Sequence, residues 1–344
     1  MNTLPAHVDV LVVGAGPIGL AVAISATRRG HVVQVIDAGP ICASIVRYPV
    51  GMTFFTTPER LEIGGHPLAC SGPKATREEA LMYYRGVVRA ERLAVRTYAR
   101  LTDAERTAEG LRCAIATPRG TETLLARRLI LATGYFEHAN QLGIDGEDLP
   151  HVSHWFAEPH TVAGQDVVVV GGKNSAIEAA LAAWRVGARV TLVHRRPELA
   201  PGVKYWLRPD FDNRVAAGEI TAHFASVVTA ITPSDVAVQH ADGTTRTVPA
   251  DRVFLLTGYH PDFALLRRLG IALDPETDRP QVDPATLETN VPGLYLAGSV
   301  AAGRRISEVF IENGRYDGEK IFGDAGTRAA TDARYARERR VQGE

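Results

Sequence analysis

Two short glycine-rich segments carry the residues of this chain whose types and spacing could do chemistry. The first contains Gly14, Gly16, Pro17, Ile18 and Gly19, between an apolar run and an alanine-rich run. In such a turn between a strand and a helix, the first glycine makes the turn and the second leaves room for a pyrophosphate. The third glycine lets the helix pack on the strand, and the helix N-terminus offers free N–H groups to the phosphates. A proline suits the first helical position. The segment therefore predicts a dinucleotide site.

An acidic residue follows this segment at a useful distance. The next apolar run, His31–Ile36, ends at Asp37 and Ala38, and Asp37 stands 18 residues after Gly19. An acid at the end of the second strand of such a unit can hydrogen-bond an adenosine ribose. We therefore expect Asp37, with its neighbour Ala38, to contact the cofactor of the first segment.

The second glycine-rich segment lies about 157 residues later and differs in two ways. Its predicted coenzyme contacts are Gly171, Gly172, Lys173, Asn174, Ser175, His194, Arg195 and Arg196. Lys173 stands where the first segment has its middle glycine, so its side chain pushes a pyrophosphate outward or contacts the phosphates. The strand that follows ends in His194-Arg195-Arg196, and arginines pair with a 2′-phosphate that an acid would repel. The economical interpretation is FAD in the first segment and NADPH in the second.

The elements around both segments predict an α/β fold. Each segment is part of a strand–turn–helix–strand unit of roughly 30 residues, the size of a βαβ module, so we expect two Rossmann-like three-layer domains. Further apolar strands are predicted over 128–132, 253–256 and 294–297, each followed by small residues. Strand meanders are expected near 95–101 and 111–126 and over 221–250, and a helix over 77–90.

Composition and charge exclude several classes of function. The 38 basic and 39 acidic side chains leave a net charge of −1, which argues against nucleic acid as the main partner. Three cysteines without a CxxC pair are no disulfide framework, so we expect a cytoplasmic protein. Glycines and Pro17 interrupt the N-terminal apolar run, which argues against a signal peptide and a membrane span. No metal-ligand spacing stands out.

The layout resembles the two-dinucleotide flavoproteins of the thioredoxin reductase type, and within them the bacillithiol disulfide reductase family (YpdA-type). The resemblance covers essentially residues 8–322. It rests on Tyr48-Pro49 with Met52–Phe55, Leu61–Gly64, Gly171–Ile177, Thr257–Asp262, Thr289–Gly298, Ala301–Gly303 and Phe310–Gly314. It implies an NADPH domain (156–287) inserted in an FAD domain (1–155 and 288–325). The rest of the chain, 326–344, is rich in Arg, Ala and Glu with little apolar periodicity, so we expect a charged C-terminal tail, either a frayed helix or a solvated segment. We also expect a homo-oligomer, a dimer or a tetramer.

The resemblance implies an FAD-dependent NADPH oxidoreductase of redox homeostasis. Its acceptor would be a low-molecular-weight thiol disulfide such as bacillithiol disulfide, or a redox protein. Further FAD contacts would be Tyr48, Met52, Thr53, Phe54, Thr133, Gly134, Gly298, Ser299, Phe310 and Ile311, and Gly258 would contact NADPH. Ile18 replaces the cysteine proposed as catalytic in this family, and Ser299 replaces an aspartate. Cys42 is then the remaining candidate nucleophile, and otherwise the flavin would reduce the disulfide directly.

Three alternatives stay open. Thioredoxin-reductase-like ferredoxin or flavodoxin reductases also lack CxxC. A flavin monooxygenase would need a stabilised oxygen adduct. A nucleotide-sensing protein would keep the fold without turnover.

Overall fold

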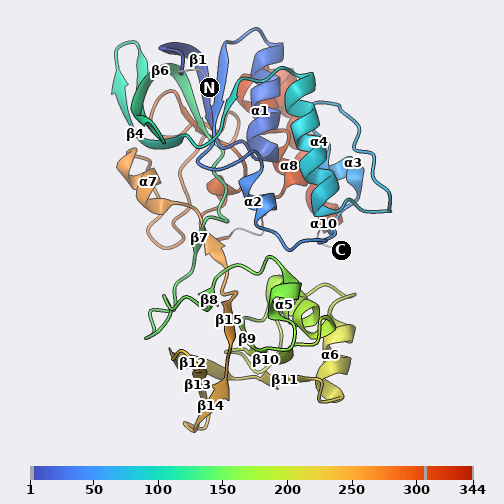
Figure 1. Cartoon of the computed structure of the whole chain (residues 1–344). Coiled ribbons are helices and arrows are strands. Elements are labelled where there is room, and N and C mark those ends of the chain that lie inside the picture. The colour runs from blue at the N-terminus through green and yellow to red at the C-terminus, as the bar shows by residue number, and fades with distance from the viewer. Residues whose placement is uncertain (1–3, 306–307, 343–344) are drawn as a thin grey trace. The chain divides into compact units, whose positions relative to one another are not determined.

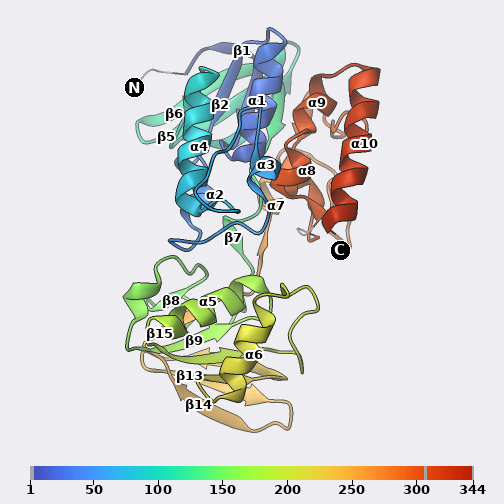
Figure 2. The same cartoon turned by 90° about the vertical axis from the view of Figure 1, so that its right-hand side faces the viewer.

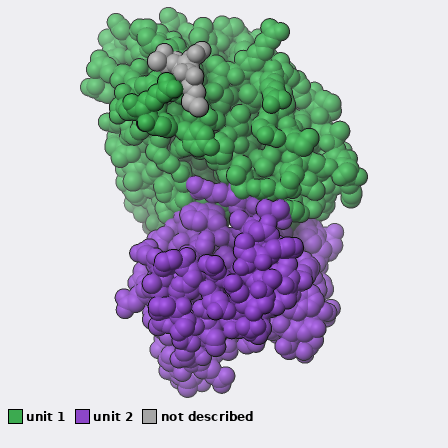
Figure 3. Space-filling model, in the orientation of Figure 1, with its two compact units in different colours: residues 1–46, 51–138, 259–344 green, residues 47–50, 139–258 purple. Residues whose placement is uncertain are grey.

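The computed structural model describes residues 4–305 and 308–342 and divides into two compact units (Figures 1 and 3). The first comprises residues 1–46, 51–138 and 259–344, and the second residues 47–50 and 139–258. The second unit is therefore an insertion in the sequence of the first. Each unit carries one of the two glycine-rich segments and is described by itself.

A seven-stranded sheet forms the centre of the first unit. Its order is β3-β2-β1-β6-β5-β4, and β17 also pairs with β6. The strands are β1 (His7–Val13), β2 (Val33–Ile36), β3 (Val95–Arg96), β4 (Arg100–Thr107), β5 (Gly110–Thr117), β6 (Gly120–Leu131) and β17 (Leu294–Leu296). The pairs among β3, β2, β1, β6 and β17 are parallel, whereas β4, β5 and β6 form an antiparallel meander. The apolar run of β1 lies in the core because the sheet is covered on both faces.

The first unit also contains eight helices among its described residues, of which α1 and α7 pack directly on the sheet. They are α1 (Pro17–Arg28), α2 (Ala43–Val46), α3 (Pro58–Leu61), α4 (Arg77–Ala90), α7 (Phe263–Arg268), α8 (Ile311–Gly314), α9 (Asp317–Phe322) and α10 (Ala325–Gln342), with a 3₁₀ turn, η2, over Gly298–Ala302. The residues of α1 from Gly19 to Ala26 are small or apolar and buried, so this helix packs closely on β1 and β2. Helix α4 begins at a capping box in which Thr76 and Glu79 satisfy each other's backbone N–H groups.

The second unit is a three-layer arrangement (Figure 2). Its parallel sheet has the order β11-β10-β9-β15-β8. The strands are β8 (Val152–Ser153), β9 (Asp166–Val170), β10 (Arg189–Val193), β11 (Ile220–His223) and β15 (Arg252–Leu255). Helices α5 (Asn174–Arg185) and α6 (Arg208–Ala216), with the 3₁₀ turn η1 (Pro159–Val162), pack on one face. The meander β12 (Ser226–Ile231), β13 (Asp235–His240) and β14 (Thr245–Pro249) packs on the other.

The predicted fold class is confirmed, but the predicted domain boundaries at 155/156 and 287/288 differ from the boundaries of the two units. The chain leaves the first unit after His138 and returns to it at Tyr259, where β7 (His138–Ala139) and β16 (Tyr259–His260) pair with each other. Strand β8 pairs with β15, which places residues near 152 in the second unit. Leu265, Leu266 and Leu269 pack in the core of the first unit, which places α7 there.

The C-terminal segment takes the helical one of the two forms predicted for it. It forms helix α10, which packs on α8 and α9 in the first unit (Figure 2). Thr331 is buried there, and most other side chains described in this helix are polar. Because the sequence of this segment lacks an apolar stripe, it did not predict that the helix packs on the rest of the unit.

Across residues 4–305 and 308–342, the structure contains no helix both long and apolar enough to cross a membrane.

Candidate functional site

In the first glycine turn, between β1 and α1, Gly14 and Gly19 are closely packed, whereas Gly16 faces open space. Gly14 has φ of +113°, and a Cβ there would lie 2.3 Å from the carbonyl oxygen of Ala132. A Cβ on Gly19 would lie 1.9 Å from the carbonyl oxygen of Gly14. A Cβ on Gly16 would meet nothing within 4 Å. Packing therefore requires glycine at positions 14 and 19, whereas Gly16 borders the space in which a pyrophosphate is expected.

The start of α1 suits a phosphate group. Gly16 is the N-cap, no side chain caps the helix, and Pro17 occupies its first position. The N–H groups of the first turn have no intrahelical partner and lie at the positive end of the helix dipole. These residues fit the pyrophosphate of FAD, with backbone donors instead of a side-chain cap.

Asp37 is held at the end of β2 by two backbone amides. Ala15 N donates to Oδ2 over 2.7 Å, and Gly39 N donates to Oδ1 over 2.7 Å. Burial raises the pKa of this carboxyl above its usual range, although both hydrogen bonds oppose the rise. The carboxylate thus ties the glycine turn to β2, in the position that the sequence predicts for a ribose contact. Ala38 lies between the two hydrogen-bonded residues Asp37 and Gly39 in the chain.

Three distant segments meet this first turn. A Cβ on Gly134, just after β6 and Thr133, would lie 3.8 Å from Oγ of Ser299. Cβ atoms on Gly298 and Gly314 would lie 2.8 Å and 2.6 Å from Cδ1 of Ile18. Ile18 therefore fills the space between the turn after β17 and helix α8, which begins just after Phe310. The structure brings together residues that the sequence separates by almost 300 positions.

The loop after α2 divides between the two units. Phe54 N donates to Ala75 O over 2.9 Å, and Met52 O accepts from Arg77 N over 2.8 Å, so this part lies beside the start of α4. Thr53 forms an isolated β-bridge with Thr76. Tyr48, by contrast, belongs to the short segment 47–50 of the second unit. The structure thus groups Met52, Thr53 and Phe54 with the first unit but does not group Tyr48 with them.

The second glycine turn, between β9 and α5, repeats the backbone of the first. Lys173 is the N-cap of α5 with φ −115° and ψ −177°, as Gly16 is the N-cap of α1 with φ −76° and ψ 174°. The predicted alignment of Lys173 with Gly16 is therefore confirmed by the helix start. Gly171 has φ of +154°, and a Cβ there would lie 2.7 Å from Leu256 O, so Gly171 plays the part of Gly14.

Gly172, which the sequence predicts to contact NADPH, packs against the side chain of His194. A Cβ on Gly172 would lie 2.2 Å from Cε1 of His194, so the imidazole packs directly against this glycine. Nε2 of His194 is buried without a hydrogen-bond partner among the described residues. Burial lowers the pKa of His194, and the charges of Arg196 and Arg195 lower it further. His194 therefore packs against the turn, and its predicted contact with NADPH stays a prediction.

Arg195 and Arg196 are both exposed at the carboxyl end of β10. Neither guanidinium makes a hydrogen bond or an ion pair with another residue in the described part of the chain. The main chain around them is fixed, because Arg196 O accepts from Ala225 N over 2.9 Å. Two available cations on a fixed backbone suit a 2′-phosphate, as the sequence predicts.

A loop that the sequence analysis did not single out joins the second turn. Lys204 N donates to Oδ1 of Asn174 over 2.9 Å, and Ala200 N donates to Gly172 O over 3.1 Å. Ser175 is exposed in the first turn of α5. Gly258, with φ of +96°, follows β15 in the same unit and accepts from Asn140 N over 2.9 Å. Asn174 therefore holds the 200–204 loop, a role that its place in a glycine motif did not reveal.

Two of the three cysteines, Cys42 and Cys113, are buried. Cys42 is 1% exposed, and burial together with the charge of Asp37 raises the pKa of its thiol far above the usual range. Burial raises the pKa of Cys113 to about 12. Cys70 lies in a loop, where its Sγ lies 3.1 Å from Gly72 O. A nucleophilic cysteine needs a lowered pKa, so neither Cys42 nor Cys113 is prepared for one.

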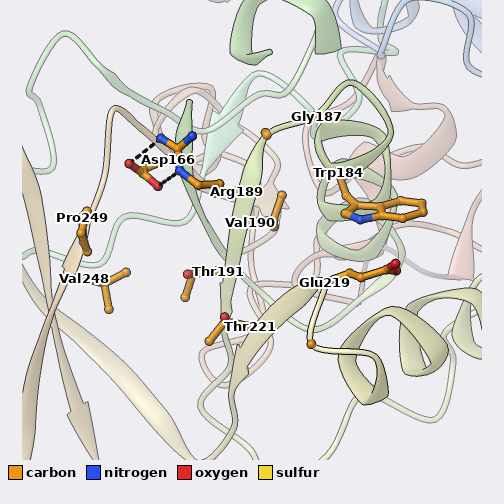
Figure 4. A pocket seen from close by; sticks show the side chains of 12 residues that line it. Asp166, Trp184, Gly187, Arg189, Val190, Thr191, Glu219, Thr221, Val248 and Pro249 are labelled. Atoms are coloured by element: carbon orange, nitrogen blue, oxygen red, sulfur yellow. Dashed lines mark hydrogen bonds and ion pairs between the residues drawn. The ribbon is translucent and has the colours of Figure 1, made fainter. Parts of the chain in front are cut away.

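A cavity of about 500 Å³ lies at the opposite end of the second sheet from the glycine turn (Figure 4). Asp166 and Arg189, at the amino ends of β9 and β10, line it and form a two-bonded ion pair there. Trp184 and Val248 contribute apolar surface. Because coenzymes bind at the carboxyl ends of such strands, this cavity is not the predicted site. Within the described ranges, no group of three or more His, Cys, Asp or Glu side chains is placed to hold a metal ion.

The chain is similar to known reductases along most of its length. Bacilliredoxin reductase Bdr of Bacillus subtilis (strain 168) is 39% identical over 318 residues, covering 92% of this chain and 97% of that protein. The structure titled bacillithiol disulfide reductase Bdr (YpdA) from Bacillus cereus has a TM-score of 0.89 at 37% identity, covering 96% of this chain and 99% of that one. A ferredoxin–NADP reductase of Ignicoccus hospitalis is 29% identical over 302 residues, 85% of this chain and 90% of that protein.

A family model described as pyridine nucleotide-disulphide oxidoreductase matches residues 11–298, which include both glycine turns. The chain is thus an oxidoreductase that uses FAD and NADPH. With this match and the Bacillus relatives, it belongs to the pyridine nucleotide-disulphide oxidoreductase family.

Proposed function

We propose that this protein is an NADPH-dependent flavoenzyme that reduces a low-molecular-weight thiol disulfide of the bacillithiol disulfide type. The observation that carries the proposal is the likeness of nearly the whole chain to the two Bdr proteins, whose names give bacillithiol disulfide or bacilliredoxin as the substrate. FAD, when bound, accepts a hydride from NADPH and supplies two electrons to an acceptor. The chain itself binds, orients and excludes water, which is what such a step requires of a protein.

Each glycine turn has a distinct task in this proposal. The open space at Gly16 admits the pyrophosphate of FAD, and Asp37 bonds the adenosine ribose. Gly134, Gly298, Ser299 and Ile18 converge beside them and would line the rest of the flavin site. In the other unit, the arginine pair after β10 selects NADPH by pairing with its 2′-phosphate.

The route to the disulfide does not use a cysteine of this chain. Ile18 stands in the first turn where a thiol would be needed, and it is packed against Gly298 and Gly314. Cys42 is buried, and its thiol pKa is raised. We therefore propose that the disulfide is reduced at the flavin without a mixed disulfide to the protein. The sparse cysteines also suit a reducing cytoplasm, and we expect a homo-oligomer.

A second candidate is electron transfer to ferredoxin or flavodoxin. The raised pKa of the buried Cys42 thiol and the likeness to the ferredoxin–NADP reductase favour it. Steady-state NADPH oxidation with bacillithiol disulfide, a ferredoxin or oxygen as the sole acceptor separates the candidates. The proposal predicts turnover that saturates with the disulfide. Turnover with ferredoxin alone would replace it by the second candidate, and turnover with oxygen alone would favour a monooxygenase.

A further inference from the structure

A buried carboxylate links the candidate flavin site to the C-terminal helix. Asp317, the first residue of α9, is 6% exposed. Its Oδ2 accepts a hydrogen bond from Gly298 N over 2.6 Å, and its Oδ1 accepts one from the hydroxyl of Tyr335 on α10. One side chain thus joins the turn after β17 to a helix almost 40 residues further along the chain.

The Gly298 turn needs such an acceptor. Gly298 has φ of +77°, and a side chain there would collide with Ile18, so the turn follows one narrow path. Its amide is buried, and a buried N–H without a partner is costly. The same turn presents Ser299 toward Gly134. Asp317 therefore fixes the main chain beside the residues proposed to line the flavin site, without being one of them.

Helix α10 depends on polar contacts to stay in place. Among its described side chains (325–338), Thr331 is the only buried one. Lys320 of α9 is also buried, and its Nζ lies 2.8 Å from Oδ1 of Asp332 and 5.2 Å from the centre of the Tyr335 ring. Glu338 lies 3.5 Å from the Arg60 guanidinium. A helix with so little apolar contact is held by these polar groups, and the Tyr335–Asp317 bond is the one that reaches the Gly298 turn.

We propose that Asp317 is a positioning residue of the flavin site, and that it couples the docking of α10 to the binding of FAD. The proposal rests on the assignment of FAD to the first glycine turn. With α10 docked, Tyr335 and Gly298 hold the carboxylate from two sides, and the turn is fixed before the cofactor arrives. Because such coupling is reciprocal, bound FAD stabilises the docked helix by the same factor.

The energetics of Asp317 agree with this role. Burial raises the pKa of its carboxyl to about 7, and the Gly298 amide and the charge of Lys320 oppose the rise. The groups that face it are the Gly298 amide from the turn, Lys320 from its own helix, and Tyr335 from α10, with Asp332 paired to Lys320. Because burial destabilises the charged form of this carboxyl, the carboxylate depends on its hydrogen-bond partners. Loss of the bond from Tyr335 should therefore also weaken the bond from Gly298 N.

Tyr335→Phe tests the coupling without touching a residue of the candidate flavin site. It removes the hydroxyl that donates to Asp317 and keeps the ring beside Lys320. We expect the dissociation constant of FAD, measured by flavin fluorescence on apoprotein refilled with FAD, to rise roughly fivefold or more, the lower end of usual coupling strengths. The control is Thr107→Val, which removes a hydroxyl that donates to Gly110 O at the turn between β4 and β5. It should change FAD affinity less than twofold.

Hydrogen exchange on the wild-type holoprotein gives a second test that needs no variant. Amides of α10 should exchange more slowly with FAD bound than after its removal. Equal exchange with and without FAD, together with an unchanged FAD affinity in Tyr335→Phe, would overturn the coupling even if the disulfide activity is confirmed. A wild-type protein that binds no FAD would overturn this proposal together with the cofactor assignment, whereas failure with the disulfide acceptor alone would leave the coupling standing.

Discussion

Gly16 and Lys173 show how one side chain changes the space for a phosphate in front of a helix when the backbone stays the same. Both are N-caps of the helix that follows the first strand of their units, with similar backbone angles. Gly16 leaves open space in front of the helix, whereas Lys173 places an exposed side chain there. A pyrophosphate can approach the first turn closely, and in the second turn it must share the space with a lysine. The two turns are therefore suited to two different dinucleotides.

Replacement of Gly16 by valine should empty the flavin site. The branched side chain would occupy the space where the pyrophosphate approaches, so we expect FAD occupancy of the purified protein to fall at least tenfold. Absorbance at the flavin band against total protein measures it. Gly86→Val is the control, because Gly86 also has open space around its Cβ position but lies in α4. A Gly16→Val protein that purifies fully yellow would refute the FAD assignment of the first turn.

Replacement of Arg195 and Arg196 by alanine should relax the choice of coenzyme. Each guanidinium is expected to make a charge-assisted bond to the 2′-phosphate, worth about 1.5–3 kcal/mol. The KM for NADPH should then rise roughly tenfold or more, with little change for NADH. Arg208→Ala, an exposed arginine on α6, controls for loss of surface charge. Equal losses with both coenzymes would mean that the pair supports the fold rather than the phosphate.

Removal of all cysteines should leave turnover almost intact. The triple variant Cys42→Ala, Cys70→Ala, Cys113→Ala is expected to stay within about threefold of wild type, under ~1 kcal/mol in the barrier. The reason is that the thiols of Cys42 and Cys113 are buried with raised pKa values. Stopped-flow absorbance separates flavin reduction from disulfide reduction. If Cys42→Ala alone stopped the second step and spared the first, Cys42 would be the nucleophile.

At the scale of elements, the sequence predicts those helices and strands whose local residue pattern marks them. Helix α4 has the predicted bounds because an apolar period follows the capping box of Thr76 and Glu79. The two-residue strand β8 has no period to detect, so the assignment of Val152 to the second unit depended on its pairing with Val253. Helix α10 lacks an apolar stripe, and Asp317 looks like any acid at a helix start. Both depend on contacts between segments distant in sequence, which no local pattern contains.

The α9–α10 contact should be visible in the pH dependence of stability. The carboxyl of Asp317 has a pKa of about 7 in the folded protein against 3.8 in an unfolded chain. A raised pKa contributes stability that is complete below pH 3.8 and is lost as the pH rises to about 7. Relative to the non-titrating Asp317→Asn variant, the wild type should lose roughly 1.4 kcal/mol of unfolding free energy per pH unit across this window.

Calorimetry of both holoproteins between pH 5 and pH 8 measures this difference. The melting temperature of the wild type should fall by several degrees more than that of Asp317→Asn as the pH rises. Parallel curves for the two proteins would show that Asp317 does not titrate in this range.

The whole molecule contains two nucleotide modules with opposite chemistry at the ends of their second strands. An acid follows β2 in the first module, and two arginines follow β10 in the second. Family membership, the fold and these two strand ends agree on one enzyme that takes electrons from NADPH through FAD. The electron acceptor is predicted least well by the residues, because Ile18 stands where a cysteine would have indicated a disulfide substrate.

Anaerobic mixing of the purified holoprotein with NADPH tests the central claim most directly. One equivalent of NADPH should bleach the flavin absorbance near 450 nm in a rapid phase. The same amount of NADH should do so at least tenfold more slowly, because it lacks the 2′-phosphate that we propose Arg195 and Arg196 to bind. Later addition of bacillithiol disulfide should restore the yellow colour. A protein that carries FAD and stays yellow with NADPH would contradict the account.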